Sequence, residues 1–138
     1  MFKNLFGNTF HKAVEYIESR EFEDKPFFMH LAFNGVAKPL VVDEQYMKLF
    51  PDFIPFNRRI FMAMILSIDV EIGRVVQSLK DRNLWDNSVI VMQALSGADD
   101  SLEGGGSNWP YRGRSGTPTE GEILPLFGGI LNLRKLRF

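Results

Sequence analysis

A long amphipathic segment between two short apolar runs sets the strongest limit on what this chain can fold into. Apolar side chains repeat at helical spacing over residues 57–81, which predicts one helix with a single apolar face. Residues 27–33 and 88–95 are almost wholly apolar, as in strands buried on both faces. Because strand, helix and strand in this order form a crossover unit, a right-handed parallel connection is expected. The prediction is an α/β chain with a mostly parallel sheet flanked by helices.

The remaining elements are short. Residues 9–18 are predicted to form a helix, and residues 44–49 one or two helical turns. Residues 123–127 and 130–131 could start a further strand, although Pro125 limits it to an edge or a bulge. Two crossover strands leave apolar faces that need neighbours, so the sheet is predicted to be incomplete. The chain therefore reads as one part of a larger α/β domain, with no second domain.

Composition excludes several classes of function. The 138 residues carry a net charge of -1, so no global field draws the chain to nucleic acid or to a membrane. The absence of cysteine excludes disulfides, thiolate metal sites, a cysteine nucleophile and any cysteine-derived cofactor. No apolar run suits a signal peptide or a membrane helix, and no Asn-x-Ser/Thr sequon occurs. The compartment is left open by these features.

Residues 104–114 combine three glycines, a Trp-Pro step and two arginines. Glycine and proline interrupt helices and strands, so this stretch is predicted to be a shaped loop. Arg112 and Arg114 are candidates for contact with an anion, because guanidinium forks match sulfate and carboxylate geometry. The structural alternative is that they pair with Glu120 or Glu103, or with backbone carbonyls, and hold the loop. The glycine run lacks the Lys-Ser/Thr pair of a phosphate-binding loop.

Four segments of the chain resemble the animal arylsulfatases of the arylsulfatase B type, within the type I sulfatase family. The similar segments are residues 27–39, 57–85, 88–97 and 104–121. The most specific is Asn-Trp-Pro-Tyr-Arg-Gly-Arg at residues 108–114, followed by Thr117 and a Glu-Gly step. It is similar to the family's Asn-Trp-Pro-Leu-Arg-Gly-Arg-Lys-x-Thr-x-x-Glu-Gly-Gly. The resemblance implies that residues 1–138 are a partial sulfatase catalytic domain, from the later portion of the N-terminal domain.

The resemblance also implies a fold and a chemistry. The family has an alkaline-phosphatase-like α/β sandwich and hydrolyses sulfate esters, often on glycosaminoglycans, in lysosomes or after secretion. Its nucleophile is a formylglycine hydrate made from cysteine, and its calcium ion is held by carboxylates and an amide. Lysine and histidine neutralise the sulfate and protonate the leaving group, as a developing oxyanion beside a dication requires.

The sequence departs from the family wherever these groups are expected. It has no counterpart of the Cys-x-Pro-Ser-Arg segment. Ala37 stands where the resemblance puts a histidine, and Ser115 where it puts a lysine. Leu95 and Ser96 replace two calcium ligands, and neither a hydrocarbon nor a lone hydroxyl suits a hard dication. No intact catalytic residue and no cofactor is therefore predicted for this chain.

Three further side chains are weaker candidates. Asp99 and Asp100 would reach a metal only after a shift of the loop, and two acids in a Gly/Ser loop are usually solvated. Lys38 would replace the missing histidine as a positive charge, whereas an exposed loop lysine is the ordinary interpretation. These observations predict a catalytically silent member of the family. The alternatives are a non-catalytic module that binds sulfated glycan or protein through Arg112 and Arg114, and a fragment whose partner is the missing part of its own domain.

Three aromatic residues receive structural predictions. His30 lies inside an apolar run and is expected to be a hydrogen-bonded core histidine rather than a ligand. His11 is expected to be exposed on a short helix, and Trp109 to pack beneath its loop.

Overall fold

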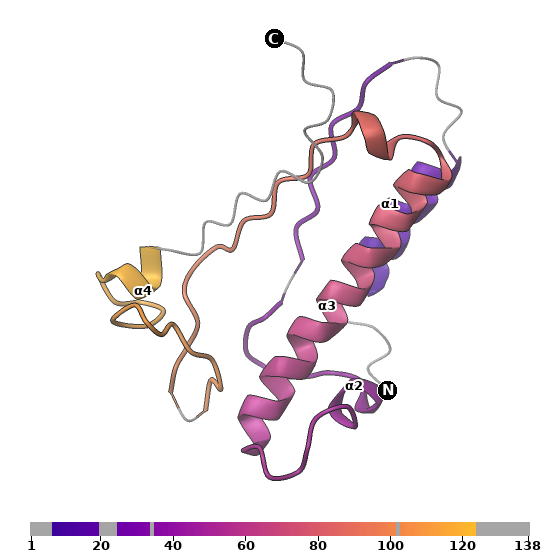
Figure 1. The fold of residues 1–138 in the computed structure, drawn as a ribbon. Helices are drawn as coiled ribbons and strands as arrows, with labels where there is room; N and C mark the ends of the chain where they lie inside the picture. The colour runs from indigo at the N-terminus through magenta and orange to yellow at the C-terminus, as the bar shows by residue number, and fades with distance from the viewer. Residues whose placement is uncertain (1–6, 20–24, 34, 102, 124–138) are drawn as a thin grey trace.

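The computed structural model describes residues 7–19, 25–33, 35–101 and 103–123. Over these residues the chain forms a set of helices joined by long extended and looped segments (Figure 1). In chain order they are α1 (Gly7–Ser19), α2 (Glu44–Met47), α3 (Phe56–Asp81), the 3-10 helix η1 (Trp85–Asn87) and α4 (Glu120–Ile123). The three helices predicted from sequence are confirmed. Ile123, where a further strand is predicted to begin, ends α4, and the rest of that prediction, residues 124–127 and 130–131, lies outside the described residues.

The core forms where α1 packs alongside α3 (Figure 1). Phe10, Ala13 and Ile17 are buried at spacings of three and four residues, so they lie on one face of α1. They join a cluster with Met64, which is fully buried on α3. The Phe10 ring also lies 5.5 Å from that of Phe33, centroid to centroid, and so ties the segment after residue 25 to the helix pair.

The buried face of α3 matches in part the one that its apolar spacing predicts. Ala63 and Ser67 are buried, whereas Ile65 is 48% exposed. The larger apolar residues Met64, Ile68, Val75 and Leu79 are buried beside these small ones, so the predicted apolar face is confirmed in part. Glu71 is also buried, and its carboxylate accepts a hydrogen bond from Arg74 Nη1 at 2.7 Å. Salt-bridge formation with an exposed arginine makes that burial tolerable.

The prediction of two parallel strands is not confirmed. Residues 27–33 and 88–95 are extended, yet no strand is assigned among the described residues. A strand requires ladder hydrogen bonds to a neighbour, and none joins these two runs in the part of the chain that the structure describes. The incomplete sheet predicted from sequence is therefore, over these residues, a pair of unpaired extended segments.

The first run nevertheless alternates like a strand that faces a core on one side. Phe27, Met29 and Leu31 are half-buried against the helix pair. Between them, Phe28 is 92% exposed and His30 is exposed as well. The prediction that His30 is a core histidine is thus wrong, because it lies on the face that nothing described here covers. His11 is exposed on α1, as expected.

Candidate functional site

The loop that carries the Trp-Pro-Arg motif is held together by one asparagine. The side chain of Asn108 accepts a hydrogen bond from the Ala98 N–H at 2.8 Å and donates to the Ala98 carbonyl at 2.8 Å. It also donates to the Gly113 carbonyl at 3.1 Å. Since Ala98 and Gly113 lie 15 residues apart in the chain, Asn108 fixes both ends of the loop. The Gly121 N–H donates to the Arg112 carbonyl at 2.9 Å and closes the far side.

The three consecutive glycines are positions of close backbone approach. A Cβ at Gly104 would lie 2.3 Å from the Asp99 carbonyl oxygen, and one at Gly106 would lie 2.5 Å from the Ala98 side chain. Gly105 has φ +70°, and a Cβ there would lie 2.5 Å from the Asn57 carbonyl oxygen. The glycine run is therefore explained by packing, which agrees with its weak signal for a phosphate-binding loop.

An arginine at the start of α3 attaches this loop to the helix. Arg58 Nη1 donates to the Gly105 carbonyl at 2.8 Å. The Arg58 guanidinium also lies 5.9 Å from the centroid of the Phe61 ring, one turn further along α3. Sequence reasoning did not single out Arg58 or Asn108, because a side chain that bonds to distant backbone leaves no periodic pattern.

Two candidates for sulfate and metal binding bind each other instead. Lys38 Nζ lies 3.0 Å from an Asp99 carboxylate oxygen and 3.6 Å from one of Glu103. The Ser101 hydroxyl and the Ser101 N–H, which lies 3.0 Å away, donate to Asp99, and with Lys38 they lower the pKa of Asp99 to about 2. The hydrogen bond to Asp99 raises the pKa of Lys38. Both side chains are therefore charged at neutral pH and satisfied by one another.

The replaced positions converge on this cluster through the backbone. Lys38 follows Ala37 and contacts Asp99, while the Ser115 N–H donates to the Ala98 carbonyl at 3.2 Å. Ala37 and Ser115 are both exposed. The structure thus brings together the three segments on which the resemblance places the histidine, the calcium ligands and the lysine. At these segments the chain has Ala37, Ser115 and the ion pair between Lys38 and Asp99.

The residues present do not fit calcium. Leu95 is 101% exposed and offers only carbon, and the Ser96 hydroxyl lies 3.3 Å from the Gly97 carbonyl oxygen, to which it donates. Asp99 is engaged by Lys38, and Asp100 is exposed. Over the described residues, no three His, Asp or Glu side chains gather where they could hold a metal.

The outer surface of the loop is formed by aromatic and arginine side chains. Trp109 is 87% exposed and Tyr111 is 50% exposed, so the prediction that Trp109 packs beneath the loop is wrong. Arg112 and Arg114 are exposed too. Their expected pairing with Glu103 or Glu120 is not found, and Glu103 instead lies beside Lys38. The loop is held by Asn108 and the glycines, which leaves both guanidinium groups facing solvent.

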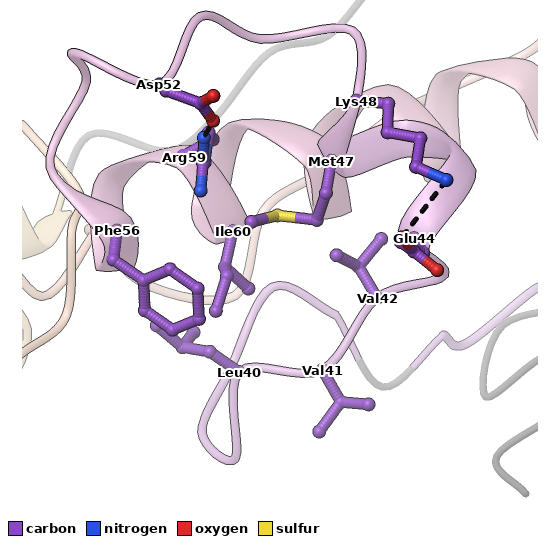
Figure 2. Close-up of a pocket in the computed structure, with 10 residues that line it drawn as sticks. All are labelled: Leu40, Val41, Val42, Glu44, Met47, Lys48, Asp52, Phe56, Arg59 and Ile60. Atoms are coloured by element: carbon purple, nitrogen blue, oxygen red, sulfur yellow. Dashed lines mark hydrogen bonds and ion pairs between the residues drawn. The ribbon is translucent and has the colours of Figure 1, made fainter.

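A separate pocket of about 490 Å³ lies between α2 and the first turns of α3 (Figure 2). Its walls are mainly apolar, and its charged residues are paired, Lys48 with Glu44 at 3.0 Å and Arg59 with Asp52. The lining residues are Leu40, Val41, Val42, Glu44, Met47, Lys48, Asp52, Phe56, Arg59 and Ile60. None of the sequence-predicted site residues lies there.

Among the described helices, none is long and apolar enough to cross a membrane.

Comparisons with known proteins agree with this arrangement of scaffold and loop. The family model described as Sulfatase matches residues 7–123. Arylsulfatase J of Mus musculus is 34% identical over 112 residues, which cover 81% of this chain and 18% of that relative. The chain thus belongs to the sulfatase family, and it spans less than a fifth of the length of this curated relative.

Solved structures give the same result for the fold. The crystal structure of Ps i-CgsB in complex with k-i-k-neocarrahexaose superposes with a TM-score of 0.76 at 29% sequence identity. The match covers 83% of this chain and 25% of that one, and the structure of Ps i-CgsB described without that ligand gives the same values. The backbone of the described residues therefore follows the sulfatase fold, which is alkaline-phosphatase-like. The sheet of that fold is not formed among these residues.

Proposed function

We propose that this chain is a sulfatase-family domain portion that does not hydrolyse sulfate esters by itself. The observation that carries the proposal is the ion pair between Lys38 and Asp99, at the point where the three segments converge. A sulfate ester brings negative charge and needs fixed positive groups around its developing oxyanion. Here the cation is neutralised by Asp99, and the neighbouring positions hold Ala37 and Ser115.

The missing nucleophile supports the same conclusion independently. Formylglycine, which the family resemblance implies, is made from cysteine, and the sequence has none. Serine and threonine are poor nucleophiles without an adjacent base. The two histidines, His11 on α1 and His30 on residues 27–33, are exposed, and neither contacts Asp99.

A chromogenic aryl sulfate assayed with calcium tests the proposal. We expect no release of the chromophore above a protein-free blank. A variant with Ala37→His, Leu95→Asp, Ser96→Asn and Ser115→Lys is expected to stay inactive too, because it still lacks a cysteine. Turnover by the unmodified chain would show that other residues supply the chemistry, and would overturn the proposal.

A second function is favoured by the outer face of the loop. Arg112 and Arg114 are exposed beside Trp109 on a loop whose backbone is fixed, so ordering the binding groups costs little. Paired guanidinium groups suit the sulfate groups of a glycan, and an exposed indole suits the apolar face of a sugar ring. We therefore infer that the loop supports binding of sulfated glycan without hydrolysis.

Binding to immobilised chondroitin sulfate or heparin tests this second function. The double variant Arg112→Ala and Arg114→Ala is expected to weaken binding about tenfold or more, as the loss of roughly 1.4 kcal/mol would. Lys12→Ala, which removes an exposed charge on α1, is the matched control and should have little effect. Equal losses in both variants would indicate general charge attraction and would exclude a loop site.

A further inference from the structure

The pocket between α2 and the first turns of α3 is lined by an arginine with an unsatisfied donor (Figure 2). The Arg59 side chain is only 17% exposed, and its Nε is shielded from solvent without a hydrogen-bond acceptor among the described residues. Its Nη1 donates instead to Asp52, whose side chain is 98% exposed. Because a buried donor without an acceptor costs free energy, an acceptor that reaches Nε would stabilise the protein.

The charged residues that line the pocket already balance one another. Lys48 lies 3.0 Å from Glu44, and Arg59 is paired with Asp52, so two cations face two carboxylates. An anionic ligand would bring a third negative charge close to Glu44 and Asp52, and a cationic ligand would lie beside the Arg59 guanidinium. The pocket therefore favours an uncharged ligand that offers an acceptor oxygen.

The walls of the pocket favour a ligand that is mainly apolar. Leu40, Val42, Met47 and Ile60 are half-buried around it, and Phe56 is 62% exposed beside them. A hydrocarbon body in the pocket would remove apolar surface of these side chains from water. The volume of about 490 Å³ lies within the range of about 300–1,000 Å³ that is usual for small-molecule sites.

We propose that this pocket binds an uncharged, largely apolar small molecule whose carbonyl oxygen accepts a hydrogen bond from Arg59 Nε. The hydrocarbon body of the ligand lies against Leu40, Ile60 and Phe56. Since Nε has almost no exposed surface, binding includes a small rotation of the guanidinium toward the ligand. None of these residues belongs to the Trp-Pro-Arg loop, so this binding and the two proposed functions can fail separately.

Three naphthalenes of similar shape test the proposal. They are 2-acetylnaphthalene, which has a ketone oxygen, 2-ethylnaphthalene, which has no acceptor, and 2-naphthoate, which is an anion. Each is titrated into the isotope-labelled 138-residue chain and followed by nuclear magnetic resonance. 2-Acetylnaphthalene is expected to shift both the Arg59 Nε–H signal and the Met47 methyl signal. 2-Ethylnaphthalene should shift the Met47 methyl signal alone, and 2-naphthoate should bind at least about tenfold more weakly than the ketone.

A conservative variant isolates the donor. Arg59→Lys keeps a positive charge beside Asp52 and removes the Nε–H group. It is expected to weaken binding of 2-acetylnaphthalene about tenfold, or roughly 1.4 kcal/mol, and to leave binding of 2-ethylnaphthalene within about a factor of two. Arg74→Lys makes the same change on α3 at a side chain that is 62% exposed, and it should affect neither ligand. The Nε–H shift is measured on the unaltered chain, so it does not depend on how well a variant folds.

Three results would overturn the proposal. The first is the lack of saturable binding of 2-acetylnaphthalene. The second is binding of the ketone that leaves the Arg59 Nε–H signal in place, or that Arg59→Lys does not weaken relative to Arg74→Lys. The third is tighter binding of 2-naphthoate than of the ketone, which would make the pocket a site for an anion.

Discussion

Replacing Asn108 by alanine should release the loop while leaving the helices folded. Asn108 makes three hydrogen bonds to backbone groups, at 2.8, 2.8 and 3.1 Å. At about 1 kcal/mol net for each bond, their loss costs the loop about 3 kcal/mol. Because every 1.4 kcal/mol is a factor of ten, protection of the loop amides against hydrogen exchange should fall about 100-fold.

The amides to follow are those of Gly106, Ser115 and Gly121, which donate within the loop at 3.0, 3.2 and 2.9 Å. Amides in the middle of α3 provide the internal reference and should exchange at unchanged rates. Asn87→Ala, at an exposed position in η1, is the matched control. The reasoning is refuted if the loop amides keep their protection in Asn108→Ala, or if Asn87→Ala exposes them equally.

Two further predictions concern the same loop. Nuclear magnetic resonance should find the pKa of Asp99 at about 2, below its ordinary 3.8. The stability that the Asp99 carboxylate contributes to the fold is complete above about pH 3.8 and is lost as the pH falls toward 2. Ser101→Ala and Lys38→Met should each raise this pKa, because each removes a group that stabilises the carboxylate, and an unchanged pKa in both variants would refute this origin of the shift. Gly105→Ala should destabilise the chain by about 1–3 kcal/mol more than Gly116→Ala in urea unfolding, because both have positive φ but only Gly105 lacks room for a Cβ. Equal costs would mean that backbone conformation alone matters.

Helices were the part of the fold that the sequence could predict. The spacing of apolar residues over 57–81 matches α3 almost to the residue, since a 3.6-residue period is a local property. Which side of α3 is buried could be predicted less well from the sequence. Ile65 is exposed and Ser67 buried because the position of α1, and not the hydrophobicity of α3, decides which side is covered.

Strands could not be predicted in the same way. The apolar run at 27–33 does lie against the core on one side, whereas the run at 88–95 packs against it only at Ile90. A strand, however, is a relation between two segments, and the necessary ladder partners are not found among the described residues. Sequence composition reports what a segment can bury and does not report what is available to cover it.

The candidate site shows a similar division. The loop position and the replaced residues Ala37, Leu95 and Ser115 could be read from the motif, because they follow its spacing. The pairing of Lys38 with Asp99 could not, since it joins residues 61 positions apart whose approach depends on the tertiary fold. This pairing turned two separate candidates into one neutral contact.

Release of inorganic sulfate would show whether this chain hydrolyses sulfate esters by itself. The chain would be incubated with calcium and either an aryl sulfate or a sulfated glycosaminoglycan, and sulfate measured by ion chromatography, with mouse arylsulfatase J assayed in parallel. We expect no sulfate above the protein-free blank from either substrate. Sulfate release that grows in proportion to the concentration of the chain, and that Asp99→Ala abolishes, would contradict this expectation.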